Sequence, residues 1–573
     1  MSESLHNDLP DATTAPRRRF RNDIAFLLIL LALVVLNWLP RLTGPIDLRW
    51  DGAVYYILGT SLAEGKGYKL LNEPGEIDAT QYPPLLPAII AVYQWILGTN
   101  DFITVGRWLR FSFFLFFVIF ILIIYQLLRN HLPAKYAFLG TLLCLFNLHI
   151  YFLSDLCFPE TLFGITTILF ILCNRNTDKR GHSVLAIVFA VASYALRTIG
   201  IAALAAWVAE SLLNKEIKKT VLRIALALIP ILSWQSYISF IESRHAYNNL
   251  AYEYQRADYL FYNVSYARNI SLLDPFAPEK GYLTFSKSVR RFVHNVTRMP
   301  ASLGEAVSIK REYWELRWAP FGRELLFTFI IPWLVHFVLI VLGCLVLIGI
   351  GLQLLRREWI IALYILIYLA GICLTPFPEQ FARYLAPLAP FLVLSLFKFF
   401  LAFKDMSHRV FSPPWKAVGL ALCVSIVSLI LVVQLLNFFQ VYVHDHQKIV
   451  YKDQNNKDIA YRLFYYGDTY KALDEGLDWL KQRAKPGDVV AASAPHWVYL
   501  RTRLKAVMPP FESDPIKAQH LLDTVPVNYL IVDEGALDTK KYLIPLLENS
   551  PERWRQVYSV PEGRFAIYQR VNP

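Results

Sequence analysis

Charged residues are scarce in this sequence. Only 18% of its 573 residues are Asp, Glu, Lys or Arg, whereas about a quarter is usual in a soluble globular protein. Hydrophobic residues make up 55% of the chain, and the mean hydropathy is +0.37. Several apolar runs approach or exceed the roughly 20 residues that cross a bilayer. This composition excludes an ordinary soluble protein and predicts one that is embedded in a membrane.

Cysteine is also rare, and its pattern argues against two kinds of site. None of the six cysteines shows the paired spacing of a zinc site or of a disulfide framework. All of them fall in or beside apolar segments, where a thiol is most simply a small packing residue. They are Cys144, Cys157, Cys173, Cys344, Cys373 and Cys423. An oxidising compartment is neither supported nor excluded.

The sequence has no internal repeat and no low-complexity segment. Matched halves are typical of transporters built from inverted repeats, so their absence weighs against that class. A cleavable signal peptide is not indicated either. The first apolar run, Ile24 to Pro40, is longer than a usual signal core, and no small-residue cleavage site follows it. We interpret this run as a retained first span.

The apolar runs predict a mainly α-helical, polytopic membrane protein with about eleven transmembrane helices. The expected spans lie near residues 24–40, 105–127, 134–151, 158–173, 183–196, 198–213, 220–240, 325–350, 359–374, 384–402 and 416–440. A further apolar stretch, Leu85 to Leu97, is too short to cross comfortably and follows Pro83 and Pro84. We expect it to form an interfacial or re-entrant helix on the outer side.

Basic residues fix the expected orientation. Arg17, Arg18, Arg19 and Arg21 precede the first span and place the N-terminus in the cytoplasm. With eleven alternating spans, every short inner loop is basic and the C-terminus lies outside. The net charge of +12 is then explained by loops that set orientation rather than by nucleic-acid binding. We expect a multi-pass protein of the inner or plasma membrane with no nucleic-acid partner.

Three parts follow from this topology. Residues 1–23 form a basic cytoplasmic segment, residues 24–440 the membrane domain, and residues 441–573 an outer domain. The membrane domain carries two large outer loops, at 41–104 and 241–324. The second loop is aromatic and charged, and it has two open interpretations: it caps the active site or binds the acceptor, or it lies on the membrane surface as an amphipathic segment.

The outer domain alternates helical and strand patterns that turn signals separate. An amphipathic helix is expected at 468–484, and buried strands are expected at 488–492, 529–533 and 564–570. We therefore expect a small extracytoplasmic α/β domain.

Acidic side chains are expensive near a bilayer, so those at the ends of spans are candidates for function. Asp51 lies just after the first span and is set among aromatic residues, in Arg49-Trp50-Asp51-Gly52. Asp155 lies in the tight outer loop between the third and fourth expected spans. Glu160 falls in the first turn of the fourth span, where the helix dipole alone would also favour a carboxylate. These three acids are the predicted catalytic residues.

Two arginines complement the acids. Arg197 and Arg383 lie at the outer ends of spans, where the positive-inside rule gives no reason for arginine. A guanidinium suits bidentate binding of phosphate, although it would also serve lipid headgroups. We predict that these two, together with Arg49, bind the phosphate of a donor. The residues predicted to bind substrate beside them are Tyr55, Tyr82 and Tyr384.

Carboxylates and arginines on one membrane face suit the transfer of a group from a lipid-linked phosphate. A phosphate is a good leaving group, so it needs positive charge more than it needs a general acid. The hydroxyl or amine of the acceptor needs one base, which a carboxylate can supply. A single displacement would invert the anomeric centre, by analogy with inverting glycosidases.

A multi-span chain with an Asp in its first outer loop and a Tyr-Pro-Pro element after it resembles the GT-C glycosyltransferases. The similarity is strongest to bacterial relatives of protein O-mannosyltransferases and of the aminoarabinose transferase that modifies lipid A. The matching elements form an ordered set over about residues 20–440. They are Asp51-Gly52 with Tyr55-Tyr56, Gly65-Lys66-Gly67-Tyr68, Gln81-Tyr82-Pro83-Pro84 with Pro87, Ser154-Asp155 with Glu160, Arg197, and Arg383-Tyr384-Leu385 with Pro387 and Pro390.

This resemblance implies a sugar donor linked to polyprenyl phosphate and a lipid, glycan or protein acceptor on the outer face. Asp51 would be the base or would position the acceptor, Asp155 would be the second acid, and the arginines would hold the donor phosphate. Gly52 stands where relatives often have another acid, and Tyr82 where aminoarabinose transferases typically have Lys, so the subgroup stays open. The resemblance requires no cofactor and leaves a divalent metal open. Some relatives bind a divalent metal between acids, but neither acidic loop has a histidine close by.

Three other functions stay open. In a secondary transporter, Asp51, Asp155 and Arg197 would be coupling charges, but such charges are expected near the midplane and these cluster at one face. A ligase or polymerase would join whole lipid-linked glycans by similar chemistry. A non-catalytic scaffold would recruit partners through its outer domain, and loss of sugar transfer on Asp51→Asn substitution would exclude it.

Overall fold

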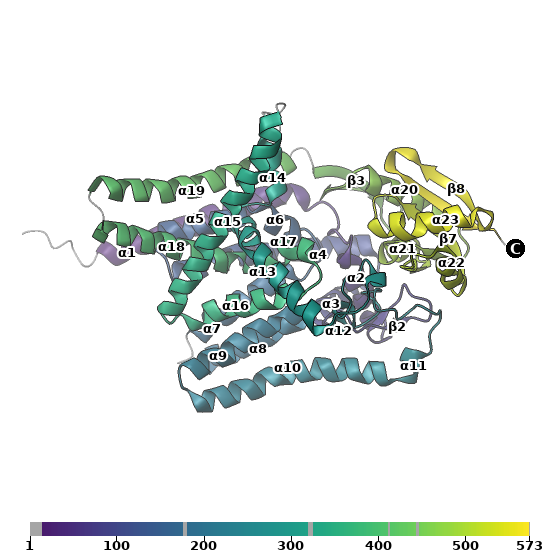
Figure 1. The fold of residues 1–573 in the computed structure, drawn as a ribbon, viewed down its shortest axis with the longest axis horizontal. Helices are drawn as coiled ribbons and strands as arrows, with labels where there is room; N and C mark the ends of the chain where they lie inside the picture. The colour runs from purple at the N-terminus through teal and green to yellow at the C-terminus, as the bar shows by residue number, and fades with distance from the viewer. Residues whose placement is uncertain (1–13, 176–179, 319–324, 411–412, 443–445, 572–573) are drawn as a thin grey trace, which may run out of the picture.

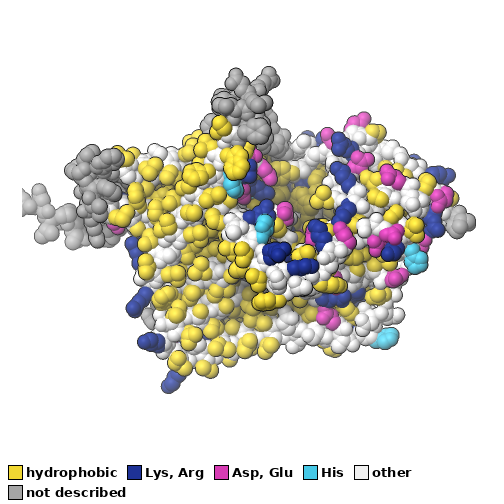
Figure 2. All heavy atoms as spheres, viewed as in Figure 1, with side chains coloured by type: hydrophobic (Ala, Val, Ile, Leu, Met, Phe, Trp, Pro, Cys, Tyr) yellow, Lys and Arg dark blue, Asp and Glu magenta, His cyan; other side chains and the backbone are white. Residues whose placement is uncertain are grey.

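The computed structural model describes residues 14–175, 180–318, 325–410, 413–442 and 446–571. A bundle of long helices forms one part of the molecule, and a smaller part with a β-sheet lies at one end of this bundle (Figure 1). Figure 2 shows a broad apolar surface over the helical part, whereas charged side chains gather over the C-terminal part. This distribution is the one expected of a multi-pass membrane protein.

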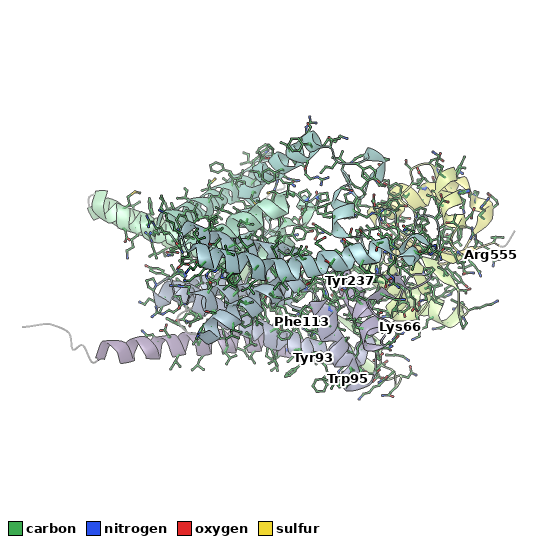
Figure 3. All side chains as sticks on the ribbon, turned by 90° about the horizontal axis from the view of Figure 1, so that it is seen from below. Lys66, Tyr93, Trp95, Phe113, Tyr237 and Arg555 are labelled. Carbon is green, nitrogen blue, oxygen red and sulfur yellow. The ribbon has the colours of Figure 1, made fainter. Side chains whose placement is uncertain are left out.

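Six helical segments of the described chain are long and apolar enough to cross a membrane. They belong to α1 (Thr14–Trp38), α4 (Phe102–Arg129), α10 (Ile217–Ser243), α15 (Leu325–Leu355), α18 (Ala389–Val410) and α19 (Pro413–Gln440). A seventh candidate is a pair of helices bent by 63°, namely α5 (Ala134–Leu145) with α6 (Leu148–Ser154). Figure 3 shows α10, marked by Tyr237, lying across one face of the bundle.

Shorter apolar helices account for the other expected spans. They are α7 (Glu160–Asn174), α8 (Arg180–Leu196), α9 (Ile201–Leu213) and α16 (Trp359–Cys373). Every expected span therefore coincides with a helix. By length and composition, six or seven described segments qualify as spans, so the number eleven stays a prediction.

The first outer loop folds into two helices and a short hairpin. It contains α2 (Asp51–Ala63), the antiparallel pair β1 (Lys69–Leu70) and β2 (Ile77–Asp78), and α3 (Leu85–Leu97). Helix α3 has the bounds of the expected interfacial helix, and its Trp95 is 77% exposed at the edge of the molecule (Figure 3). The two helices pack closely at Gly59, where a Cβ atom would lie 2.8 Å from Ile90.

The second outer loop is mostly helical. It contains α11 (His245–Asn248), α12 (Tyr266–Ile270), α13 (Phe285–Val307) and α14 (Arg311–Trp318). Helix α13 changes its surroundings along its length: Val289 and Val293 in its first half are exposed, whereas Leu303 and Val307 in its second half are buried. A short helix, α17 (Phe381–Leu385), precedes α18 at the same end of the bundle.

The C-terminal part contains a hairpin and a mixed five-stranded sheet. The hairpin pairs β3 (His446–Lys452) with β4 (Asp458–Phe464). The sheet has the order β6 (Lys505–Val507), β5 (Val489–Ala491), β7 (Val527–Asp533), β9 (Phe565–Arg570), β8 (Trp554–Val560), and β5 runs parallel to both of its neighbours. The helices around it are α20 (Asp468–Arg483), α21 (Pro495–Thr502), α22 (Pro515–Asp523) and α23 (Ile544–Asn549). The helix and the three strands expected from the sequence coincide with α20, β5, β7 and β9.

The C-terminal part is attached to the first outer loop by hydrogen bonds. Asn72 and Ala506 exchange a backbone N–H···O bond of 2.8 Å and a side-chain bond of 3.0 Å. The guanidinium of Arg49 donates to the carbonyl oxygens of Phe464 and Tyr465 at 2.7 and 3.2 Å. The Asn72 bonds attach the sheet to the first outer loop, and the Arg49 bonds hold the end of the hairpin against the segment that leads into Asp51.

Candidate functional site

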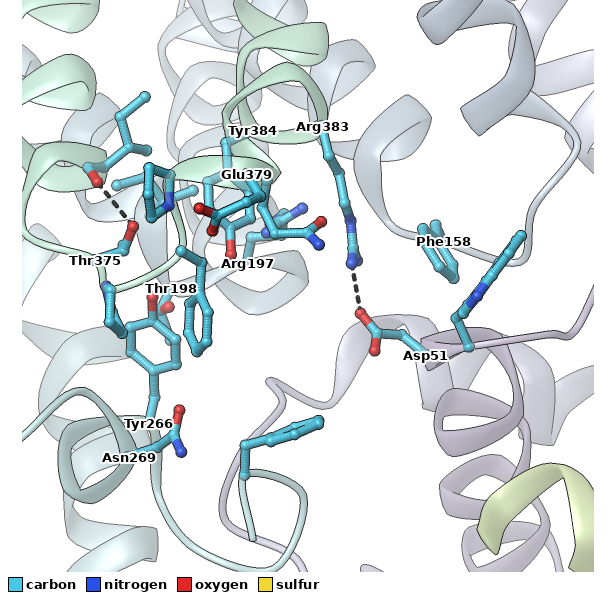
Figure 4. Close-up of a pocket in the computed structure, with 18 of the residues that line it drawn as sticks. Asp51, Phe158, Arg197, Thr198, Tyr266, Asn269, Thr375, Glu379, Arg383 and Tyr384 are labelled. Atoms are coloured by element: carbon cyan, nitrogen blue, oxygen red, sulfur yellow. Dashed lines mark hydrogen bonds and ion pairs between the residues drawn. The ribbon is translucent and has the colours of Figure 1, made fainter. Parts of the chain in front are cut away.

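A cavity of about 1360 Å³ lies where the outer loops, the ends of several helices and the C-terminal part meet. Six of the nine predicted site residues line it: Asp51, Tyr55, Tyr82, Arg197, Arg383 and Tyr384. Figure 4 shows Asp51 and Arg383 facing each other across part of this space. The structure therefore brings together residues that are more than 300 positions apart in the sequence.

Asp51 is the first residue of α2, where the positive end of the helix dipole favours a carboxylate. Its Oδ2 lies 2.7 Å from Nη1 of Arg383, and its Oδ1 accepts a hydrogen bond of 2.9 Å from the hydroxyl of Tyr262. Burial alone would raise the pKa of the Asp51 carboxyl. The charge of Arg383 and the hydrogen bonds from Arg383, Tyr262 and Tyr82 outweigh this effect and hold the pKa below its ordinary value. Asp51 is therefore ionised at neutral pH.

Arg383 joins two acids. Besides its contact with Asp51, its Nε donates to Oε1 of Glu160 at 2.5 Å. The same Glu160 oxygen accepts a hydrogen bond from Arg197, which lies at the turn between α8 and α9. Glu160 begins α7 and is buried, and its second oxygen, Oε2, has no hydrogen-bond partner among the described residues. Two acids and two arginines thus form one cluster whose formal charges balance.

Tyrosines surround this cluster. The rings of Tyr55 and Tyr82 lie 4.7 Å apart, and Tyr82 lies 6.2 Å from Tyr262. The guanidinium of Arg197 lies 5.4 Å from the ring of Tyr384. Tyr262 belongs to the second outer loop, which therefore contributes to the cavity wall, while the first half of α13 in the same loop has the exposed apolar face of an amphipathic segment. Which of its two expected roles this loop has stays a prediction.

Asp155 lies beside the cavity rather than in its lining. Its carboxylate is buried and forms ion pairs with Arg41 and Arg110, the latter at 2.8 Å. Its carbonyl oxygen accepts a bond of 3.2 Å from the N–H of Asp47, and the carbonyl of Asp47 in turn accepts one of 2.9 Å from Cys157. Asp155 thereby ties the loop before Glu160 to the loop before Asp51.

Arg49 also lies outside the cavity lining. Its Nη2 lies 2.6 Å from the buried carboxylate of Asp47, and its other bonds go to the C-terminal hairpin. The structure therefore places Arg49 at the junction between the first outer loop and the C-terminal part. It does not bring Arg49 together with Arg197 and Arg383.

Two residues that the sequence did not mark as site residues hold Asp51 in place. Tyr262 donates to it, and His496 of α21 packs edge-on against Tyr262 with ring centroids 4.5 Å apart. Burial lowers the pKa of His496 to about 3, so this imidazole is neutral at physiological pH. One signal was available for His496: it follows the carboxyl end of the parallel strand β5, a position where functional residues often gather.

The donor groups of the cavity do not fit a divalent metal. Across the described ranges, no three His, Cys, Asp or Glu side chains are grouped so that they could hold an ion. Asp51 and Glu160 instead share the guanidinium of Arg383, whose positive charge lies where a cation between two acids would lie. We assign no metal to this site.

Comparisons with known proteins identify the fold. No model of a protein family matches the sequence, and no curated protein matches it. The oligosaccharyltransferase of Archaeoglobus fulgidus, in a complex with zinc and sulfate, aligns with a TM-score of 0.51 and 12% identity over 95% of this chain and 73% of its own. A structure of the same enzyme tethered to an acceptor peptide with an NVT sequon aligns with a TM-score of 0.50 and 14% identity over 96% of this chain and 74% of its own.

A third solved structure, ArnT of Cupriavidus metallidurans bound to undecaprenyl phosphate, aligns over 96% of this chain and 98% of its own at 10% identity. Its TM-score of 0.48 is too low to support an argument. The alignments with the oligosaccharyltransferase confirm the resemblance to the GT-C fold over nearly the whole chain. At such low identity they establish the fold and not the activity.

Proposed function

We propose that this protein is a membrane glycosyltransferase that moves a sugar from a polyprenyl-phosphate donor to an acceptor on the outer face of the membrane. The observation that carries the proposal is the cluster of Asp51, Arg383, Glu160 and Arg197 at a large cavity, in a chain with the GT-C fold. The expected orientation, with a cytoplasmic N-terminus, puts this cavity on the outer side.

Arg197 and Arg383 bind the donor phosphate in this proposal. Arg383 uses Nη1 and Nε to contact the two acids, and in the part of the chain that the structure describes its Nη2 forms no hydrogen bond that would keep it from a ligand in the cavity. In the displacement, the oxygen or nitrogen of the acceptor forms a bond to the anomeric carbon while the bond from that carbon to the phosphate oxygen breaks. The leaving phosphate takes the electron pair, and the two guanidinium groups stabilise its growing charge. The anomeric centre is inverted.

Asp51 receives the proton of the acceptor. With its pKa held low by Arg383, the free-enzyme carboxylate is ionised but weakly basic. A phosphate bound at Arg383 would compete for that guanidinium and raise the basicity of Asp51. The base would therefore become effective only when the donor is in place.

The other predicted residues act around this centre. Tyr55, Tyr82 and Tyr384 line the cavity and suit substrate contact, and Glu160 fixes both arginines. We propose that Asp155 and Arg49 act as positioning residues, since each is paired outside the cavity lining and supports the loops that carry Asp51 and Glu160.

The proposal is tested with the purified full chain in nanodiscs and polyprenyl-phosphate-linked sugars extracted from membranes. Mass spectrometry would follow loss of the lipid-linked sugar and release of polyprenyl phosphate. We expect turnover by the wild type, none by Asp51→Asn, and near-wild-type turnover by the matched control Asp274→Asn. Asp274 also lines the cavity but pairs with Lys280 at 2.7 Å. Undiminished turnover by Asp51→Asn would contradict the proposal.

A further inference from the structure

One wall of the cavity is made of four aromatic residues in consecutive contact. The rings of Trp50 and Phe152 lie 6.0 Å apart, and those of Phe152 and Tyr465 lie 4.9 Å apart. The hydroxyl of Tyr465 is hydrogen-bonded to that of Tyr313. The four residues come from the first outer loop, α6, α14 and the segment after the C-terminal hairpin, and all of them line the cavity.

Trp50 is held in an unusual conformation on this wall. Its φ of 56° and ψ of −132° lie in a region that non-glycine residues rarely adopt, at a cost of about 1–3 kcal/mol. Even so, the residue is 40% exposed. Phe152 and Tyr470 contact the ring edge-on, and the guanidinium of Arg49 lies 4.7 Å from it. A strained backbone that presents an exposed aromatic ring to a cavity indicates a surface for stacking a ligand, and the C–H faces of sugar rings suit such a surface.

Lys310 lines the cavity next to this wall, one turn before Tyr313. The other cations of the lining already have partners: Arg383 pairs with Asp51, Arg197 with Glu160, and Lys280 with Asp274. Among the described residues, no ion pair or side-chain hydrogen bond is formed by the ammonium group of Lys310. A half-buried ammonium group in this position favours an anion.

Two groups near Lys310, Glu305 and His149, decide what the ammonium group could bind. The carboxylate of Glu305 accepts the backbone N–H of Arg311 at 3.0 Å, and it lies close enough to Lys310 for the charge of the ammonium group to act on it. His149 lines the same part of the cavity, and its buried Nε2 has no hydrogen-bond partner among the described residues. Its ring lies 6.3 Å from Phe152. Within the described ranges, an ammonium group without an ion pair and an imidazole nitrogen without a hydrogen-bond partner thus lie beside an aromatic platform.

We propose that this wall is the acceptor subsite and that it takes a carbohydrate with an anionic group, either a phosphate or a carboxylate. The sugar ring stacks on Trp50, and the anion pairs with Lys310 and accepts a hydrogen bond from His149. The inference rests on the proposed function, because it assigns the donor phosphate to Arg197 and Arg383 and leaves Lys310 for the acceptor.

The test measures binding of three soluble sugars to the purified full chain by calorimetry: glucose, glucose 6-phosphate and glucuronate. We expect at least one of the two anions to bind about tenfold more tightly than glucose, and the better one identifies the anionic group. Lys310→Gln should abolish this preference and Lys310→Arg should retain it. Lys280→Gln, which removes a cation that is already paired, should also retain it. Trp50→Ala should weaken the binding of all three sugars by the same factor.

Two results would overturn the inference. The first is an unchanged preference for anions in folded Lys310→Gln, with folding checked by its melting temperature. The second is displacement of glucose 6-phosphate by farnesyl phosphate, which would assign Lys310 to the donor instead. Neither result depends on turnover, because both are read from binding and folding alone. Failure of the acceptor subsite is therefore distinguishable from failure of the proposed reaction.

Discussion

Replacing Arg383 by Gln removes a side chain that contacts both acids of the cluster. Asp51 and Glu160 lose ion pairs of 2.7 and 2.5 Å, and their side chains are only 14% and 2% exposed. Breaking a buried ion pair costs about 3–5 kcal/mol, because the remaining charge stays without compensation. We therefore expect Arg383→Gln to lower the melting temperature at neutral pH by about 5–10 °C.

The pH dependence of this loss has a defined sign. In the wild type the pKa of Asp51 is lowered from its ordinary value of 3.8. The ion pair with Arg383 therefore stabilises the folded state fully above pH 3.8, and this contribution is lost only as the pH falls through the lowered pKa. Without Arg383, burial is the dominant influence and raises the pKa of Asp51. The variant is then destabilised as the pH rises through the raised value, and it should regain stability as the pH is lowered from 8 towards 5.

Thermal unfolding of the detergent-purified protein between pH 5 and 8 measures this difference. Arg244→Gln is a matched control, because Arg244 is half exposed and its distance to Asp78 is 3.4 Å. We expect the control to follow the wild-type curve, and we expect Arg383→Gln to lose turnover at least about 100-fold. A melting temperature for Arg383→Gln that matches the control at every pH would refute the reasoning.

Two further substitutions separate positioning from catalysis. Asp155→Asn leaves the buried guanidinium groups of Arg41 and Arg110 without their carboxylate, so we expect the free energy of unfolding by denaturant to fall by about 3–5 kcal/mol. Unfolding at the same denaturant concentration as the wild type would contradict the positioning role of Asp155. His496→Ala removes the ring that packs on Tyr262, so we expect turnover to fall about tenfold and His496→Phe to restore most of it. Because the pKa of His496 is about 3, its substitution should leave the pH profile between 5 and 8 unchanged, and a shifted profile would show that its charge matters.

The cluster at the cavity was largely predictable from the sequence, because charges at the outer ends of apolar helices are few and must lie on one face. Asp51, Glu160, Arg197 and Arg383 carry that signal and meet in the structure. Asp155 carries the same signal but lies outside the cavity lining. Sequence spacing could not reveal this, because its partners come from the end of the first span and from the first third of the long helix α4.

Contacts between distant parts of the chain explain the rest of what the sequence did not predict. Tyr262 and His496 reach Asp51 only because the second outer loop and the C-terminal part close over the first loop. The hairpin of β3 and β4 mixes polar and apolar residues without a clear period, so the sequence did not predict it. Arg49 and Arg110 donate hydrogen bonds to backbone carbonyl oxygens at the end of β4 and just after it. The positions of helices follow from apolar runs, whereas the number that cross the membrane depends on how short helices pack.

The central claim is that Asp51 is the base for sugar transfer from a lipid phosphate. The most direct measurement compares wild type and Asp51→Asn for turnover and, separately, for binding of undecaprenyl phosphate. We predict that turnover falls by a factor of about 10² to 10⁴, while the lipid phosphate binds at least as tightly as to the wild type, because the neutral Asn no longer competes for Arg383. Turnover that survives the substitution, or a loss explained entirely by weaker lipid binding, would contradict the account.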